Sequence, residues 1–193
     1  IGGGFGGKIP IYLEPIAAML SKASGQPVKL IMTRPAVFES TGPTPGSYIK
    51  IKMGANKDGK ITAADAYIAF ESGAYPGGLV GAAAMCVFSC YDIADGLIDC
   101  YDVVLNKPRS FAYRAPGSTQ ACFATEQVID LLAAELGIDP LEFRLKNCAT
   151  TGTRRIDGVV YPKMGCKEVL ETIRDSDHYK SSALTGRNQG RGI

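Results

Sequence analysis

The sequence is poor in the features that metal-binding and membrane-spanning proteins usually show. It has one histidine, His178, and its six cysteines include no Cys-x-x-Cys pair. Because zinc sites are built from cysteine and histidine at short, regular spacings, we expect no zinc site. No apolar run is long enough to cross a bilayer, and no basic flank with an apolar core opens the sequence. We therefore expect a soluble, cytoplasmic protein.

The chain also lacks a large excess of charge of either sign. The chain has 21 Lys and Arg against 19 Asp and Glu, and the basic residues are scattered rather than clustered. Nucleic acids and anionic membranes attract proteins through basic patches, so neither is an expected partner. With 46% hydrophobic residues in a chain of 193, there is enough apolar material for the core of one globular domain or two small ones.

The cysteines and the histidine are not expected to carry chemistry. Cys86 and Cys90 lie four residues apart in an apolar stretch, which is typical of buried, reduced thiols. His178 lies in a polar segment and is expected to be solvated rather than catalytic. The six cysteines are Cys86, Cys90, Cys100, Cys122, Cys148 and Cys166.

Glycine, by contrast, is abundant, above all in residues 1–8, Ile-Gly-Gly-Gly-Phe-Gly-Gly-Lys. Glycine loses more backbone freedom on folding than any other residue, so such a run is expected where backbone must approach a ligand closely. Residues 9–24 are predicted to form a helix directly after it. The unpaired N–H groups at a helix start favour an anion, such as a phosphate or an oxo group.

Two nucleotide-binding motifs match this run only in part. Residues 2–7 fit the dinucleotide pattern G-x-G-x-x-G, but five glycines make that match nearly automatic, and no acidic residue closes a strand near Met32. Residues 2–8 fit most of a P-loop, but Ile9 stands where a Ser or Thr should bind magnesium. A non-catalytic phosphate- or nucleotide-binding module and a purely structural glycine turn remain as alternatives.

The rest of the chain alternates helix and strand signals, which predicts an α+β fold with helices packed on short mixed β-sheets. An Asp-Gly pair at 58–59 predicts a hairpin between strands at 48–53 and 60–70. Residues 28–32 are predicted to form a short buried strand, and 79–90 either a buried helix or a packed loop. Further elements are predicted at 98–105 and 159–161 (strands) and at 119–136, 140–147 and 166–175 (helices). Apolar residues at Leu13, Ile16, Ala17, Met19 and Leu20 predict a core-facing stripe on the first helix.

The chain is expected to be a part of a larger domain. Residues 1–75 carry the glycine loop, a helix and strands, and residues 76–193 carry a second loop at 110–118 and the helical part. Residue 1 already lies within the glycine motif, although the common phosphate-binding loops follow a strand. We therefore expect 1–193 to be excised from a longer polypeptide.

Three stretches together resemble the molybdenum hydroxylases, the xanthine dehydrogenase and aldehyde oxidase family. Residues 2–8 are similar to the loop that binds the molybdenum cofactor, and residues 112–117, Ala-Tyr-Arg-Ala-Pro-Gly, are similar to the second cofactor loop. Residues 126–147, which include Gly-Ile-Asp-Pro-Leu-Glu-Phe-Arg, resemble the helical stretch that follows. Phe5 fits this resemblance because an aromatic ring beside a backbone anion site suits a flat organic substrate.

The resemblance implies a molybdopterin-binding catalytic subunit. Such a subunit holds a molybdenum–molybdopterin cofactor, in bacteria usually the cytosine dinucleotide, and oxidises a carbon atom with water as the oxygen source. Electrons leave through 2Fe-2S clusters and FAD on partner domains or subunits. No side chain of this chain would ligate the metal directly. The resemblance assigns Gly4, Phe5, Gly6 and Arg114 to cofactor binding, and Phe5, Ile9, Tyr113 and Pro116 to the pocket of a small organic substrate.

Departures from the family narrow the substrate. Purine-oxidising members follow the loop lysine with a glutamate, whereas Ile9 stands here, and residues 73–90 contain no arginine that could bind a purine. Members that oxidise carbon monoxide carry a cysteine where this chain has Ala115. We therefore expect an aldehyde or an aromatic or N-heterocyclic substrate. The family's general base is a glutamate in a later part of the subunit, so the piece alone is expected to be inactive.

Overall fold

The computed structural model of the chain describes residues 3–182, 184 and 186–192. The first two residues of the glycine run, Ile1 and Gly2, lie outside the described residues. The chain divides into two compact units, each assembled from several segments. Unit 1 contains residues 1–49, 68–84 and 99–121, and unit 2 contains residues 50–67, 85–98 and 122–193.

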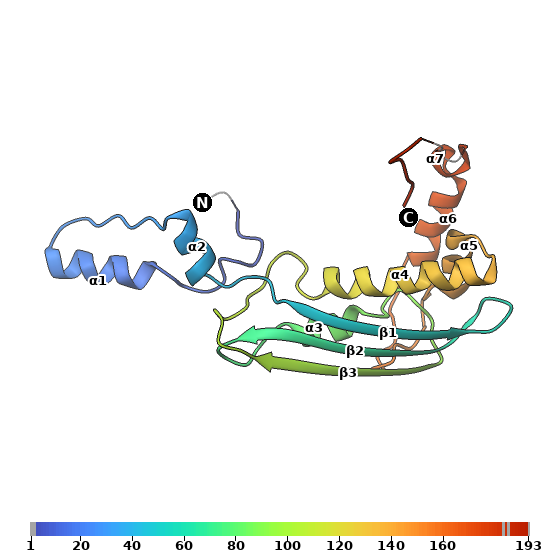
Figure 1. Cartoon of the computed structure of the whole chain (residues 1–193), viewed down its shortest axis with the longest axis horizontal. Coiled ribbons are helices and arrows are strands. Elements are labelled where there is room, and N and C mark those ends of the chain that lie inside the picture. Colours follow the sequence, from blue (N-terminus) through green and yellow to red (C-terminus); the bar gives the residue numbers. More distant parts are fainter. Residues whose placement is uncertain (1–2, 183, 185, 193) are drawn as a thin grey trace. The chain divides into compact units, whose positions relative to one another are not determined.

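A mixed three-stranded sheet has the order β1-β2-β3 and contributes strand segments to both units (Figure 1). Its strands are β1 (Ser47–Ala55), β2 (Ile61–Gly73) and β3 (Asp95–Val104). β1 and β2 form the predicted hairpin, closed by a Gly59 N–H that donates to the Asn56 carbonyl at 2.9 Å. β3 runs parallel to β2 after a crossover that contains α3 (Val80–Cys86) (Figure 1). The predicted α+β class with a mixed sheet is therefore confirmed.

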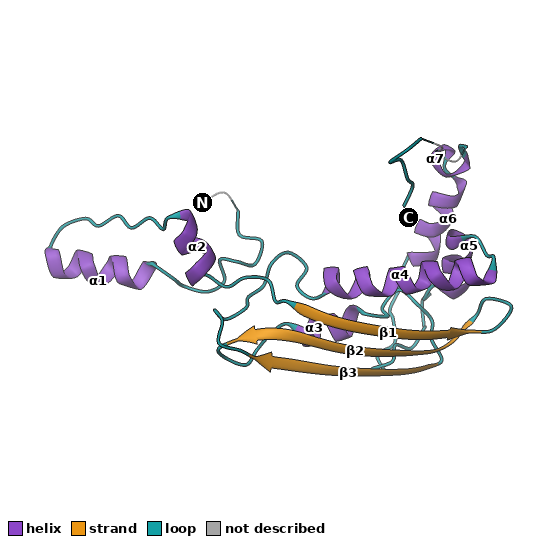
Figure 2. Cartoon of the chain, in the orientation of Figure 1, coloured by secondary structure: helices purple, strands orange, loops and turns teal. Residues whose placement is uncertain are grey.

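The helices other than α3 lie in two groups along the chain (Figure 2). The N-terminal group is α1 (Glu14–Ser24) and α2 (Arg34–Ser40). The C-terminal group is α4 (Ser118–Leu136), α5 (Pro140–Asn147), α6 (Cys166–Asp175) and α7 (Asp177–Lys180). No helix in the described part of the chain has the length and apolar character needed to cross a bilayer.

Unit 2 has a core in which a buried amide joins the hairpin to the end of α5. Asn147 is fully buried, and its side-chain carbonyl accepts the Ile61 N–H at 2.8 Å. Its amide donates to the carbonyls of Gly59 and Phe143 at 2.7 and 2.9 Å. Because every polar atom of the side chain has a partner, its burial is compatible with a stable core. Large apolar residues around it include Ile61, Ile129, Leu141 and Phe143.

Two predictions for the N-terminal part were wrong. The first helix begins at Glu14 rather than residue 9, because Pro15 fits only the first turn of a helix. None of its residues is buried, so the predicted core-facing stripe is exposed. Residues 28–32 form no strand, and Ile31 is 75% exposed. An apolar face is buried only when another element packs against it. Among the described residues, no element covers the apolar side chains of α1 or of Ile31.

Four further predictions concern single segments or side chains. Residues 80–86 form α3 and residues 87–90 form turns, which decides the case that periodicity left open. The predicted strand at 159–161 is reduced to an isolated bridge between Arg154 and Val160. Cys86 is only half-buried and Cys90 is exposed, so the predicted burial of this pair was wrong for Cys90. His178 is exposed, as predicted.

Candidate cofactor site

The glycine loop folds back on itself instead of entering a helix. The Gly7 N–H donates to the Gly4 carbonyl at 2.9 Å, and the Ile9 N–H donates to the Gly6 carbonyl at 3.3 Å. Five further residues follow Lys8 before α1 begins at Glu14. The prediction that the glycines present their N–H groups at a helix start was therefore wrong for this loop.

Phe5 is held in an uncommon conformation at the centre of the loop. Its φ angle is 53°, in the left-handed region that bulky residues rarely adopt. Gly3 makes room for the ring, because a Cβ atom there would lie 2.5 Å from a ring carbon of Phe5. The Phe5 side chain is nevertheless 56% exposed. The loop thus presents an aromatic ring to the outside on a backbone that is strained to do so.

The second loop, residues 112–117, lies directly against the glycine loop in unit 1. The backbone N–H of Arg114 donates to the Phe5 carbonyl at 2.6 Å. Gly6 lies so close to the second loop that a Cβ atom there would be 2.8 Å from the Ala112 carbonyl oxygen. Ala115 has a φ angle of 55°, so a second non-glycine residue in the left-handed region follows Arg114. The structure therefore brings the two sequence motifs together.

The second loop leads straight into the N-terminus of the longest helix, α4. The Ser118 N–H donates to the Ala115 carbonyl at 3.1 Å, and the Ala121 N–H donates to the Gly117 carbonyl at 3.0 Å. Gly117 has a φ angle of 79° and backs onto the start of α3, where a Cβ atom would lie 2.5 Å from the Ala83 nitrogen. The helix start that favours an anion thus belongs to the second loop rather than to the glycine loop.

An aromatic contact between Tyr12 and Phe111 joins the segment that follows the glycine loop to the segment that precedes the second loop. The Tyr12 hydroxyl accepts the Gly42 N–H at 3.0 Å, and its ring meets Phe111 edge-on with 6.4 Å between centroids. The Phe111 N–H donates to the Pro43 carbonyl at 2.9 Å. Edge-to-face aromatic pairs stabilise beyond their buried area. The sequence analysis did not identify Tyr12 or Gly42 as part of this site. For Tyr12 the only sequence signal is that an aromatic residue follows the glycines closely, and for Gly42 there is none.

The side chains assigned to this site lie on the two loops and are largely open to solvent. Ile9 is 78% and Tyr113 60% exposed, whereas Pro116 is half-buried. Arg114 is exposed, and within the described residues no acceptor pairs with its guanidinium. An unpaired guanidinium, glycines that permit close approach of the backbone and a helix N-terminus together fit a flat, anionic cofactor.

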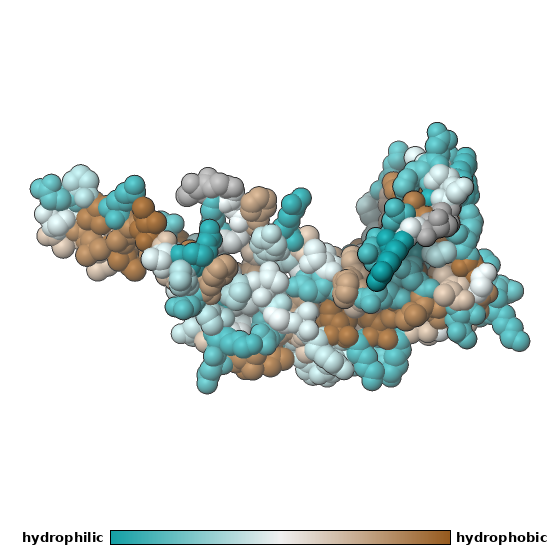
Figure 3. Space-filling view, turned by 45° about the horizontal axis from the view of Figure 1, so that its top comes forward, coloured by the Kyte–Doolittle hydropathy of each residue, from teal (hydrophilic) through white to brown (hydrophobic). Residues whose placement is uncertain are grey.

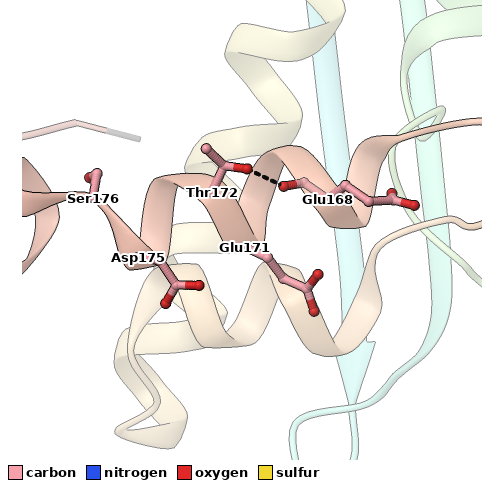
Figure 4. Close-up of a pocket in the computed structure, with 5 residues that line it drawn as sticks. All are labelled: Glu168, Glu171, Thr172, Asp175 and Ser176. Carbon is pink, nitrogen blue, oxygen red and sulfur yellow. Dashed lines mark hydrogen bonds between the residues drawn. The ribbon is translucent and has the colours of Figure 1, made fainter.

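Unit 2 carries a separate acidic groove on α6 and the residue that follows it (Figure 4). In it, the Thr172 hydroxyl donates to the Glu168 carbonyl at 2.7 Å. Within the described residues no group of three or more His, Cys, Asp or Glu side chains could hold a metal ion. The lining residues of the groove are Glu168, Glu171, Thr172, Asp175 and Ser176.

Comparison with known proteins assigns the two loops to a single domain. Residues 1–148 match the family described as molybdopterin cofactor-binding domain. The aldehyde oxidoreductase molybdenum-binding subunit PaoC of Escherichia coli is 37% identical over 76% of this chain and 20% of its own length. The putative xanthine dehydrogenase molybdenum-binding subunit XdhA of E. coli is 32% identical over 98% of this chain and 26% of its own length.

A solved structure agrees with these relatives. The aldehyde oxidoreductase from Desulfovibrio gigas superimposes with a TM-score of 0.83 and 28% identity, over 90% of this chain and 20% of that one. The chain thus spans between a fifth and about a quarter of each of these three proteins. From its sequence, its two loops and its fold, the chain belongs to the molybdopterin cofactor-binding family of the molybdenum-dependent aldehyde oxidoreductases and xanthine dehydrogenases.

Proposed function

We propose that the chain is a part of the molybdopterin-binding catalytic subunit of a molybdenum-dependent hydroxylase. The subunit would oxidise an aldehyde, or an aromatic or N-heterocyclic carbon, with water as the oxygen source. The observation that carries this proposal is the junction of the two loops, where the Arg114 N–H donates to the Phe5 carbonyl at 2.6 Å. A separate phosphate- or nucleotide-binding module would not need this second loop.

The loop residues would bind the cofactor in different ways. Gly4 and Gly6 lack side chains and would let the backbone approach it, and the backbone of Phe5 between them would lie close to it as well. The Arg114 guanidinium, which has no partner within the described residues, would stabilise negative charge on the cofactor. When bound, the molybdenum centre would supply the two-electron oxidation, without a direct bond to a side chain of this chain.

The substrate pocket would be walled by apolar and aromatic side chains. Phe5, Ile9 and Tyr113 are all exposed beside or on the two loops, and Pro116 adds a rigid edge. Ile9 offers no hydrogen bond to a purine, and burying an unpaired purine amide is unfavourable. Ala115 supplies no thiol for a carbon monoxide site. A flat organic aldehyde or heterocycle is therefore the favoured substrate class.

Other parts of the enzyme would come from outside residues 1–193. The chain spans only 20% of PaoC and 26% of XdhA, and we propose that the rest of the subunit supplies the general base. Within the piece, residues 1–75 would contribute the glycine loop and residues 76–193 the second loop. The cofactor would be the cytosine dinucleotide form, and 2Fe-2S clusters and FAD would lie on partner subunits or domains of a cytoplasmic complex. Residues 1–193 alone would then be inactive.

Metal and cofactor analysis of the full subunit tests this proposal. We expect one molybdenum per chain and release of a cytidine nucleotide on acid treatment. Arg114→Ala should abolish turnover in a folded subunit, whereas Arg174→Ala, at the end of α6 where its side chain pairs with Asp175, should leave it unchanged. A subunit that binds ATP and contains no molybdenum would support the phosphate-binding module instead.

A further inference from the structure

Residues 28–32 of unit 1, Val-Lys-Leu-Ile-Met, have a strand-forming sequence but no neighbouring strand. They run without helix or strand between α1 and α2 (Figure 1). Within the described residues none of their backbone N–H or C=O groups is hydrogen-bonded. Val28 and Met32 are half-buried, whereas Lys29, Leu30 and Ile31 are exposed. The middle of this apolar segment is therefore uncovered on both of the faces that a strand would have.

The neighbouring helix α1 exposes apolar side chains in the same unit. None of its residues is buried, and Met19 is 72% and Ile16 50% exposed. Figure 3 shows a brown, hydrophobic region at its left, where α1 lies. Contiguous exposed apolar surface of this kind usually marks an interaction site. Helix α1 and residues 28–32 are therefore both apolar segments of unit 1 that are largely exposed.

An open strand edge with apolar side chains is rarely left uncovered. Native proteins protect such edges with charge, proline or a covering element, because unpaired backbone groups favour pairing with another chain. Here only Lys29 interrupts the apolar side chains, and β-branched Val28 and Ile31 favour a strand. The missing element is thus a second strand rather than a helix, because it must satisfy backbone groups as well as cover side chains.

We propose that residues 28–32 pair, as a β-strand, with an apolar strand of the same catalytic subunit that lies outside residues 1–193. This rests on the proposed function, in which the chain is a piece of a larger subunit, and on the chain's spanning only 20% of PaoC and 26% of XdhA. Two separate proteins need about 1,200–2,000 Å² of buried surface for a specific complex, more than a five-residue edge supplies. A strand of the same polypeptide avoids the entropy of association.

Hydrogen–deuterium exchange in the full subunit tests the pairing. We expect the amides of residues 29–32 to exchange at least 100-fold more slowly than the exposed hairpin turn at 57–58. Exchange as fast as in that turn would overturn the proposal. Slow exchange that is lost when the protein is diluted would mean that residues 28–32 pair with a second copy of the subunit. That result would also overturn the proposal. Molybdenum content, measured on the same sample, reports separately on the proposed function.

A pair of substitutions at Ile31 adds a second test. Ile31→Asp places a charge in the proposed interface, whereas Ile31→Val keeps a β-branched apolar side chain. We expect the Asp variant to lower the thermal midpoint of the full subunit by several degrees and the Val variant to leave it within one degree. Because Ile31 is 75% exposed without a partner, equal midpoints for both variants would overturn the proposal.

Discussion

Phe5 and Arg114 are joined by a backbone hydrogen bond of 2.6 Å, and left-handed backbone occurs on both sides of it. Phe5 has a φ angle of 53°, and Ala115, which follows Arg114, has one of 55°. Left-handed backbone costs a non-glycine residue about 1–2 kcal/mol. Each loop therefore holds the other in a conformation that neither sequence favours alone, and strain of this kind is concentrated at functional sites.

Substitutions at Ala115 should test this backbone strain. A substitution that relieves the strain should not lower the stability, whereas one that increases the strain should lower it. Ala115→Gly accommodates the positive φ angle and should leave the free energy of unfolding unchanged or raise it by up to about 1 kcal/mol. Ala115→Val places a β-branched residue in the left-handed region and should lower it by about 1–2 kcal/mol. Denaturant unfolding of the full subunit measures both values. Equal stabilities for the two variants would show that this backbone conformation is not maintained.

Gly6→Ala should separate the two loops. The added methyl group would meet the Ala112 carbonyl at 2.8 Å on a residue whose φ angle is 95°. We expect the variant subunit to fold but to retain at most about a tenth of its molybdenum, because the cofactor would lose its two-loop contact. Gly81→Ala is the control, since a Cβ atom there meets nothing within 4 Å. Full molybdenum content in both variants would contradict the close approach at Gly6.

Tyr12→Phe should weaken the anchor between the loops without removing its ring. The Gly42 N–H would lose its acceptor, which costs about 0.5–1.5 kcal/mol for a hydrogen bond of this kind. The ring contact with Phe111 should remain, so turnover should fall less than in Phe111→Ala, which removes both the ring and the packing on Gly42. The ratio of turnover to molybdenum content separates poor positioning from loss of cofactor. A Phe111→Ala enzyme with normal turnover would contradict the positioning role.

Elements with strong local signals could be predicted from the sequence. The turn at residues 58–59 and the helix at residues 140–147 are examples, and the Asp139 carboxylate caps that helix by accepting the N–H groups of Leu141 and Glu142 at 2.8 and 3.1 Å. Such features depend on residues a few positions apart. The resemblance also named Phe5 and Arg114 as site residues, although nothing in the sequence indicated the hydrogen bond between them.

Features that depend on residues far apart in the sequence were not predicted, because local patterns carry no information about such contacts. The Tyr12–Phe111 contact joins segments that no local pattern relates, and residues 28–32 have a strand sequence without a strand partner. Helix α1 carries a clear apolar stripe, but whether that stripe is buried depends on what packs against it. Sequence patterns therefore predicted which elements form better than which surfaces they bury.

Unit 2 contains a charge network centred on one buried arginine, and this network should make stability depend on pH. Arg144 is buried and bonds Glu126 and Asp130, each at 2.8 Å. The Tyr91 hydroxyl donates to the Glu126 carboxylate at 2.8 Å. Burial, followed by the negative charge of Glu126, raises the pKa of Tyr91 above its ordinary value. The native state therefore keeps this proton at a pH where the unfolded chain releases it.

Tyr91→Phe should reveal this effect in alkaline solution. Because the folded pKa is raised, the contribution of Tyr91 is fully present below the unfolded pKa of about 10 and is lost as pH rises above it. The wild type should be more stable than Tyr91→Phe at pH 8 by about 0.5–1.5 kcal/mol, the usual value of a hydrogen bond. Above about pH 10 the difference should shrink, since only the wild type has a proton to lose at this site. Urea unfolding between pH 8 and 11 measures it, with Tyr75→Phe at an exposed position as the control. A difference that stays constant up to pH 11 would show that Tyr91 titrates alike in the folded and unfolded states.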